Sequence, residues 1–194
     1  EIAQYIKKKG GDAVMAERLN QLKKFTAPTP EVEQSASILE GVKAYLVRIS
    51  RLEAVTMLGL GKMDFAEKLY DKCIEILPSL DNYQQKIRFY MDANNFRAVI
   101  NTCDQALKNG ELSKEDAREI LEIKARTYLL LKNNSAAIET FQELLKISNT
   151  KWKVLFNIAV LQRKMASPQR ALKTLNEALS YRSSTQIPAE YLRG

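Results

Sequence analysis

The chain has 194 residues, of which 30 are lysine or arginine and 23 are aspartate or glutamate, for a formal net charge of +7. It contains 7 glycines, 5 prolines and no histidine. So few turn-forming residues leave little room for many short strands and tight hairpins. The lack of histidine excludes histidine-based nucleophile systems, histidine-ligated zinc and histidine pH switches. The length suits one ordinary domain or a short array of repeats.

The two cysteines, Cys73 and Cys103, are too few for a disulfide scaffold and lack C-x-x-C spacing. We expect both to pack as small apolar side chains, and a single disulfide between them is the alternative. No apolar run approaches the ~18–20 residues that cross a bilayer, and residues 1–10 lack the apolar stretch of a signal peptide. The chain starts without methionine, so we interpret it as a fragment, and its composition slightly favours a cytoplasmic location.

The charge is unevenly spread along the chain. Residues 151–194 hold eight basic and two acidic residues, a net charge of +6, and residues 1–25 have a net charge of +3. Residues 26–150 together have a net charge of −2. Basic ends favour an acidic partner, a nucleic acid or an anionic membrane surface, and a solvated face is the simpler interpretation.

In chain order, residues 2–25 predict a short helix, a break at Gly10 and Gly11, and a second amphipathic helix with Asp12 as its N-cap. Residues 26–30 then interrupt any helix, with Pro30 placed at the first position of the next one. From there to residue 60 the pattern predicts one long helix or two helices bent near Gly41.

Beyond residue 47 the sequence repeats itself, in steps of 33, 38 and 34 residues. Each repeat predicts a first helix, a turn of three or four residues, and a second helix with a small residue where helices approach closely. The 38-residue step contains a loop at residues 109–113, and Ser113 and Asp116 have the spacing of a capping box. We call the residues that are equivalent from repeat to repeat the reference positions. In the second helices they are Ala66, Val99, Ala137 and Ala171, and in the first helices they are Ala54, Ile87, Ala125 and Ala159. A single helix pair cannot bury both of its apolar faces, so the pairs must stack on one another.

This pattern resembles the tetratricopeptide repeat family over residues 47–183, most strongly at residues 58–78, where the closing Pro78 is present. The other repeats have Glu111, Asn149 and Ser183 at that place. Where the family has an early tryptophan, this chain has Ser50, Tyr83, Leu121 and Leu155. The resemblance implies an all-α fold, a right-handed α-α superhelix of about four repeats. Residues 1–46 would form capping N-terminal helices and the start of the long helix, and residues 184–194 would begin a further helix.

In this family the first helix of each repeat lines the ligand groove. The resemblance therefore implies a concave partner-binding face made of Arg51, Arg88, Met91, Arg126, Lys153, Phe156, Asn157 and Arg163. Guanidinium groups beside apolar side chains would suit an acidic peptide with an apolar anchor. The residue set with which some members clamp a chaperone's terminal carboxylate is not matched here. We expect Trp152 to cover the seam between repeats, and Tyr70, Tyr90, Tyr128 and Phe141 to lie in the core.

The leading functional prediction is a non-enzymatic scaffold or adaptor that binds a peptide or helix of another protein, without a cofactor or metal. The alternative is a helical-repeat protein that binds nucleic acid through its basic C-terminal region. Catalysis is not expected. Gly59 and Gly61 lack the spacing of a phosphate-binding loop. Without histidine, a nucleophile would need help from a lysine or a carboxylate, and nothing in the sequence marks a pocket that holds such a pair. Exposed solenoid ends also make homo-oligomers an open possibility.

Overall fold

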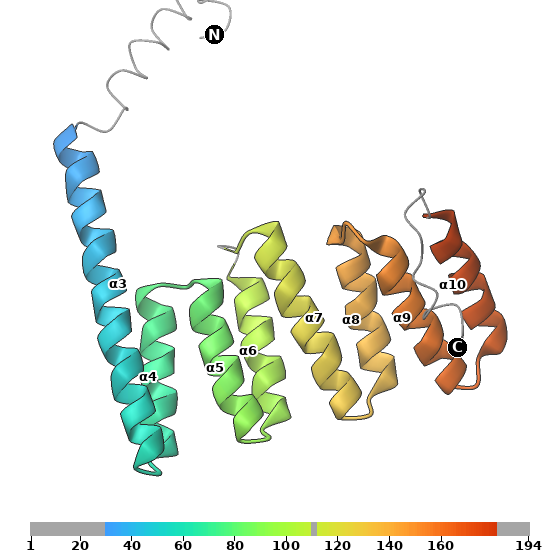
Figure 1. The fold of residues 1–194 in the computed structure, drawn as a ribbon, viewed down its shortest axis with the longest axis horizontal. Helices are drawn as coiled ribbons and strands as arrows, with labels where there is room; N and C mark the ends of the chain where they lie inside the picture. Colours follow the sequence, from blue (N-terminus) through green and yellow to red (C-terminus); the bar gives the residue numbers. More distant parts are fainter. Residues whose placement is uncertain (1–29, 110–111, 182–194) are drawn as a thin grey trace, which may run out of the picture. The chain divides into compact units, whose positions relative to one another are not determined.

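The computed structural model describes residues 30–109 and 112–181, which form α-helices joined by short turns, with no strand among them (Figure 1). The chain divides into two compact units, Glu1–Leu46 and Val47–Gly194. The helices predicted within residues 2–25 and beyond residue 184 lie outside the described residues, and the capping role of residues 1–46 stays a prediction. None of the described helices has the length and apolar character needed to cross a membrane.

The long helix predicted to follow residue 29 is one unbroken helix, α3 (Pro30–Gly59), and not two helices. Its last part, from Val47, belongs to the second unit. There it is followed by α4 (Met63–Ile76), α5 (Leu80–Asp92), α6 (Phe96–Lys108), α7 (Lys114–Leu130), α8 (Asn134–Ile147), α9 (Lys151–Lys164) and α10 (Pro168–Ser180). These helices alternate as the first and second members of the predicted pairs, so the all-α repeat architecture is confirmed.

The reference positions of the repeats are buried because they lie where helices approach most closely. All four positions of the second helices and all four of the first helices are buried. The residues that replace the family's early tryptophan are also buried: Ser50, Tyr83, Leu121 and Leu155. The repeat spacing therefore marks the packing face of every helix pair.

The core runs through the stacked pairs as two clusters that meet within α7. Ile120 belongs to the first cluster and the adjacent Leu121 to the second. Burial of Tyr70, Tyr90 and Phe141 confirms their predicted place in the core, and Tyr128 is half-buried against the second cluster. Each helix pair thus covers the apolar face of its neighbour, as a stacked repeat requires.

Both cysteines are free and buried, which confirms their packing role and overturns the disulfide alternative. Burial raises the pKa of the Cys103 thiol to about 12, and the nearby Asp104 carboxylate acts in the same direction. Burial also raises the pKa of Cys73, whose Sγ lies 3.7 Å from the carbonyl oxygen of Val47. Both side chains are therefore protonated, unreactive thiols at neutral pH.

The predicted capping box at the start of α7 is confirmed. The backbone N–H of Asp116 donates to Ser113 Oγ at 3.1 Å, and the N–H of Ser113 donates to Asp116 Oδ2 at 3.2 Å. Three further caps were not predicted: Ser79 accepts from the N–H of Asn82 at 3.4 Å, Asn95 accepts from the N–H of Ala98 at 3.2 Å, and Asn133 occupies the same place before α8. These side chains satisfy backbone donors that the first turn of a helix leaves unpaired.

The turn inside each helix pair contains one residue in the left-handed region. It lies five positions before the reference residue of the second helix, and the four φ values are 72° at Gly61, 55° at Asn94, 56° at Lys132 and 53° at Ala166. Glycine adopts this conformation without a penalty, whereas a Cβ costs about 1–2 kcal/mol there. The turn geometry is therefore common to the repeats, and only the first has the residue that suits it best.

We expect Ala166→Gly to stabilise the protein by about 0.5–1 kcal/mol, because removing the Cβ relieves strain at an exposed turn position. Gly61→Ala should have the opposite effect and destabilise by about 1 kcal/mol. Open space surrounds Gly61, so only its backbone conformation should matter. Urea unfolding followed by circular dichroism measures both changes, and a lower midpoint for Ala166→Gly would contradict this account.

Candidate functional site

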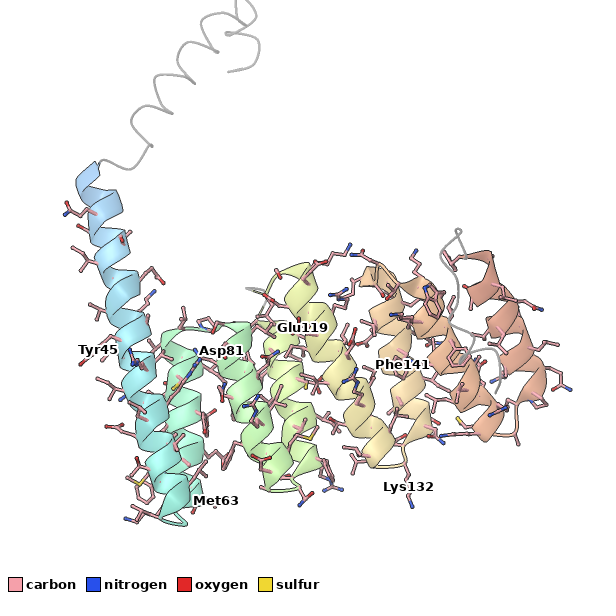
Figure 2. The ribbon with its side chains drawn as sticks, in the orientation of Figure 1. Tyr45, Met63, Asp81, Glu119, Lys132 and Phe141 are labelled. Carbon is pink, nitrogen blue, oxygen red and sulfur yellow. The ribbon has the colours of Figure 1, made fainter. Side chains whose placement is uncertain are left out.

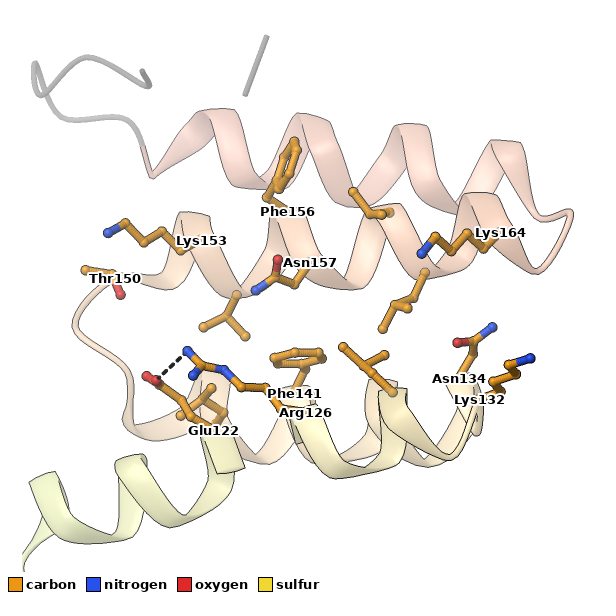
Figure 3. A pocket seen from close by; sticks show the side chains of 15 residues that line it. Glu122, Arg126, Lys132, Asn134, Phe141, Thr150, Lys153, Phe156, Asn157 and Lys164 are labelled. Atoms are coloured by element: carbon orange, nitrogen blue, oxygen red, sulfur yellow. Dashed lines mark ion pairs between the residues drawn. The ribbon is translucent and has the colours of Figure 1, made fainter. Parts of the chain in front are cut away.

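A hollow of about 830 Å³ opens between α7 and α9, the first helices of two consecutive pairs (Figure 3). Its floor consists of core side chains from α8 and α9: Phe141, Leu144, Val154 and Leu161. Half-buried Leu129 and Val160 extend this apolar surface from the two facing helices. The hollow therefore has an apolar base that remains accessible from the solvent.

Charged groups stand around this apolar base, and they are mostly cationic. The lining contains Arg126, Lys132, Lys153 and Lys164 against a single carboxylate, Glu122, a net charge of +3. Figure 3 shows Arg126 and Lys153 toward one end of the hollow, and Lys132 and Lys164 toward the other. Asn134 and Asn157 add amide groups that can donate or accept hydrogen bonds. Both ends of the hollow are thus suited to negatively charged groups.

One pair of repeat positions differs between the hollow and the preceding pair of first helices. Between α5 and α7, Gln84 donates from Nε2 to Glu119 Oε2 at 3.0 Å, so these two side chains bridge neighbouring first helices. The equivalent positions between α7 and α9 hold Glu122 and Lys153. Glu122 pairs instead with Arg126 on its own helix. The side-chain bridge between α5 and α7 is therefore not repeated between α7 and α9, where both Glu122 and Lys153 line the hollow.

The Glu122–Arg126 pair is weak enough to be replaced by a ligand. The two groups lie 3.8 Å apart, and their side chains are 43% and 74% exposed. An exposed pair at this helical spacing contributes only about 0.3–0.5 kcal/mol. A carboxylate that meets the guanidinium with two parallel hydrogen bonds would form a stronger contact. Arg126 is thus a suitable anion-binding group in the hollow.

The structure brings together half of the sequence-predicted concave face. Arg126, Lys153, Phe156 and Asn157 line the hollow, whereas Arg51, Arg88, Met91 and Arg163 do not. The side chain of Arg51 already contacts α5. Its Nε donates to Asn82 Oδ1 at 3.1 Å, and its Nη2 pairs with the Asp81 carboxylate.

Four polar residues of the lining were not predicted: Lys132, Asn134, Thr150 and Lys164. Lys164 follows Asn157 by seven residues and so lies on the same face of α9, a signal that the sequence offered. Lys132, Asn134 and Thr150 lie in turns or at a helix start, where spacing along a helix gives no indication.

The described residues contain no group of three or more cysteine, aspartate or glutamate side chains that could hold a metal ion. The side chains of the hollow can form ion pairs, donate hydrogen bonds and make apolar contacts. This chemistry is that of a binding surface.

Stacked helix pairs with small residues at their contacts and a hollow between first helices define a helical-repeat solenoid. The tetratricopeptide repeat family profile matches residues 119–151, which cover most of α7, all of α8 and the first residue of α9. Residues 119–151 are thus similar to a tetratricopeptide repeat, and the described helices on either side of them continue the same alternation of first and second helices.

Among solved structures, a crystal structure of MamA protein superimposes with a TM-score of 0.51 at 13% identity, covering 79% of this chain and 92% of that one. The structure of MamA AMB-1 gives a TM-score of 0.50 at 12% identity, covering 82% of this chain and 91% of that one. At this identity the likeness is one of fold. No curated protein sequence matches the chain.

Proposed function

We propose that this protein is a non-enzymatic interaction scaffold that binds a peptide or helix of a partner protein in the hollow between α7 and α9. The observation that carries the proposal is the lining itself, with four cations and one carboxylate around an apolar base. The tetratricopeptide repeat architecture supports the same class of function, since stacked repeats offer an extended surface for a partner.

The chemistry of the lining favours an acidic segment with one apolar anchor. The anchor side chain would rest on Leu129 and Val160 and displace water from the apolar base. Acidic side chains on one side of the anchor would meet Arg126 and Lys153, and those on the other side would meet Lys132 and Lys164. A hollow of about 830 Å³ suits an anchor with its flanking residues, not an entire domain.

The proposal predicts that peptides selected from a random displayed library against the chain will carry Asp or Glu on both sides of a large apolar residue. Arg126→Glu/Lys153→Glu should weaken the binding of such a synthetic peptide by about tenfold or more, because each reversal turns attraction into repulsion. Glu122→Gln should strengthen binding by about two- to threefold, since Arg126 loses its weak internal partner. Fluorescence anisotropy of the labelled peptide measures both effects.

The matched control is Arg88→Glu/Arg163→Glu, which makes the same change of charge on first helices but outside the hollow. Its effect on the peptide should stay within about twofold at moderate salt. An equal loss of peptide affinity in the two double variants would show that the peptide responds to the overall charge of the chain. The hollow would then not be the binding site. Capture of single-stranded nucleic acid, with no peptide enriched, would favour the alternative function.

A further inference from the structure

A second surface, which adjoins the hollow and shares Lys132 and Lys164 with it, combines exposed apolar and basic side chains. It consists of the turns that join the two helices of each pair, together with the helix residues next to them. Six large apolar side chains here are 43–62% exposed: Leu60, Met63, Phe65, Leu130, Leu131 and Met165. Covering an apolar side chain of this size would provide favourable free energy in proportion to the area removed from water.

These side chains belong to one edge of the repeat unit. Leu60, Leu131 and Met165 occupy the same position in their repeats, six residues before the buried reference residue. Figure 1 shows the turns α3–α4, α5–α6, α7–α8 and α9–α10 at the same end of the helix pairs. In Figure 2 the labelled Met63 and Lys132 both lie at this end. We call this surface the turn edge.

The opposite edge is different. The connections between successive pairs, over the described residues of 76–80, 108–114 and 147–152, contain no exposed large apolar side chain. After α3, the other exposed large apolar side chains of the described part are Leu172, Leu179 and Tyr181, at the last helix. From residue 60 onward, six of the nine exposed large apolar side chains of the described part therefore lie at the turn edge, and α3 has a separate exposed apolar set of its own.

Basic side chains stand among these apolar ones. In the eight residues that end at each reference position, the turn edge has two acidic residues, Asp64 and Asp92. Against them stand five basic residues, Lys62, Arg97, Lys132, Lys164 and Arg170, which leaves a net charge of +3. Side chains of this kind bury their apolar stems while the charged ends remain at a polar boundary. The combination is that of a surface that meets an anionic interface.

We propose that the turn edge binds the surface of an anionic phospholipid membrane. Its apolar side chains would enter the boundary between headgroups and acyl chains, and its lysines and arginines would contact the lipid phosphates. A membrane fits this edge better than a protein does, because the apolar side chains occur on separate turns with polar residues between them. A fluid lipid surface can cover separate points, whereas a protein interface has a contiguous apolar centre.

The test is co-sedimentation of the chain with vesicles of phosphatidylcholine, with and without about 30% phosphatidylglycerol. We expect binding to the anionic vesicles, little binding to pure phosphatidylcholine, and a loss of about fivefold or more when salt rises from about 0.05 to 0.3 M. Leu60→Gln/Phe65→Gln/Leu131→Gln should reduce the partition coefficient by about tenfold. These three residues do not line the hollow, so peptide binding should be unchanged.

Two sets of controls make the result specific. Ile49→Gln/Leu52→Gln/Leu179→Gln removes exposed apolar side chains of the second unit that do not belong to the turn edge and should change the partition coefficient by less than about twofold. Lys62→Glu/Arg97→Glu/Arg170→Glu should abolish binding. Lys108→Glu/Lys114→Glu/Lys146→Glu, on the opposite edge, should retain most of it.

Equal losses in the two glutamine variants would overturn the proposal, and so would binding that needs no anionic lipid. Binding that depends on charge alone, with the turn-edge glutamine variant unaffected, would also overturn it. If the chain does not sediment with any of the vesicles, the turn edge does not bind membranes and the proposal is wrong. Circular dichroism of each variant establishes that its helices are intact before the comparison.

Discussion

Asn82→Ala is expected to destabilise the protein by about 3 kcal/mol, an unusually large effect for the loss of one amide side chain. Asn82 is 1% exposed and lies in the first turn of α5. Its Nδ2 donates to the carbonyl oxygens of Leu77 at 2.6 Å and Cys73 at 3.2 Å, and its Oδ1 accepts from Arg51 Nε at 3.1 Å. One side chain thus connects the last part of α3, the end of α4 and the turn before α5.

The expected loss follows from what the substitution leaves unpaired. Alanine provides neither the donor for the two carbonyl groups nor the acceptor for Arg51, and each buried polar group without a partner costs about 1–3 kcal/mol. Arg51→Ala should cost less, about 1 kcal/mol, because its contacts with Asp81 are partly exposed. Asn101→Ala, at an exposed position of α6, serves as the control and should change stability by less than about 0.5 kcal/mol.

Urea unfolding followed by circular dichroism measures these differences. In a repeat protein a local weakness can separate one pair from the rest, so a first, shallower phase of unfolding at lower urea is the expected signature of Asn82→Ala. A single transition with the midpoint of the wild type would contradict the role assigned to Asn82.

The repeat architecture could be predicted from the sequence because it depends on residues that recur at fixed steps. Positions such as Ala66 and Ala137 must be small where two helices meet, and this requirement appears directly in the sequence. The capping box at Ser113 was predictable for a similar reason, since it depends on a spacing of three residues. The caps at Asn95 and Asn133 had the right residue type, but their turns are too short to identify an N-cap by pattern alone.

The candidate site was less predictable, because it depends on contacts between residues far apart in sequence. The first-helix pattern placed Arg126 and Lys153 on the concave face, and both line the hollow. The same pattern also placed Arg51 on the concave face, although its guanidinium pairs with Asp81, some 30 residues further along the chain. Side chains at repeat-equivalent positions therefore have different partners, and helix periodicity does not distinguish them.

The same limit applies to the polar contacts inside the stack. The position of Asn82 is occupied by Ile120 and Val154 in the next two first helices, and the position of Lys86 by Lys124 and Ile158. All of these residues except Lys124 are buried. The interfaces before α5 and α7 thus contain an ion pair where the interface before α9 is apolar. The repeat pattern specifies that a side chain packs there, but not which chemistry satisfies it.

This difference leads to the second prediction of large effect, for the ion pair between Lys86 and Asp71. The side chain of Lys86 is only 6% exposed, and its Nζ contacts the Asp71 carboxylate, which is 45% exposed. The Nζ also lies 5.6 Å from the ring centre of Tyr90, whose hydroxyl donates to Glu67 at 2.6 Å. Asp71→Ala would leave a buried ammonium group without its counter-ion, so we expect a loss of about 2–4 kcal/mol.

Lys86→Met should behave differently, because it removes the buried charge together with its need for a partner. We expect a change within about 1 kcal/mol, in either direction, since an apolar side chain of similar volume can replace a buried ion pair. Ile158 is buried at the equivalent position in the interface before α9, so an apolar residue is compatible with this position of the repeat. Asp71→Ala/Lys86→Met should therefore be far more stable than Asp71→Ala alone.

The three variants and the wild type form a double-mutant cycle, measured by urea unfolding under one set of conditions. A coupling free energy of about 2 kcal/mol or more is expected, because the second substitution cancels most of the cost of the first. If Lys86→Met costs as much as Asp71→Ala, the pair contributes net stability. An apolar residue at this position, as in the interface before α9, would then contribute less stability than the ion pair.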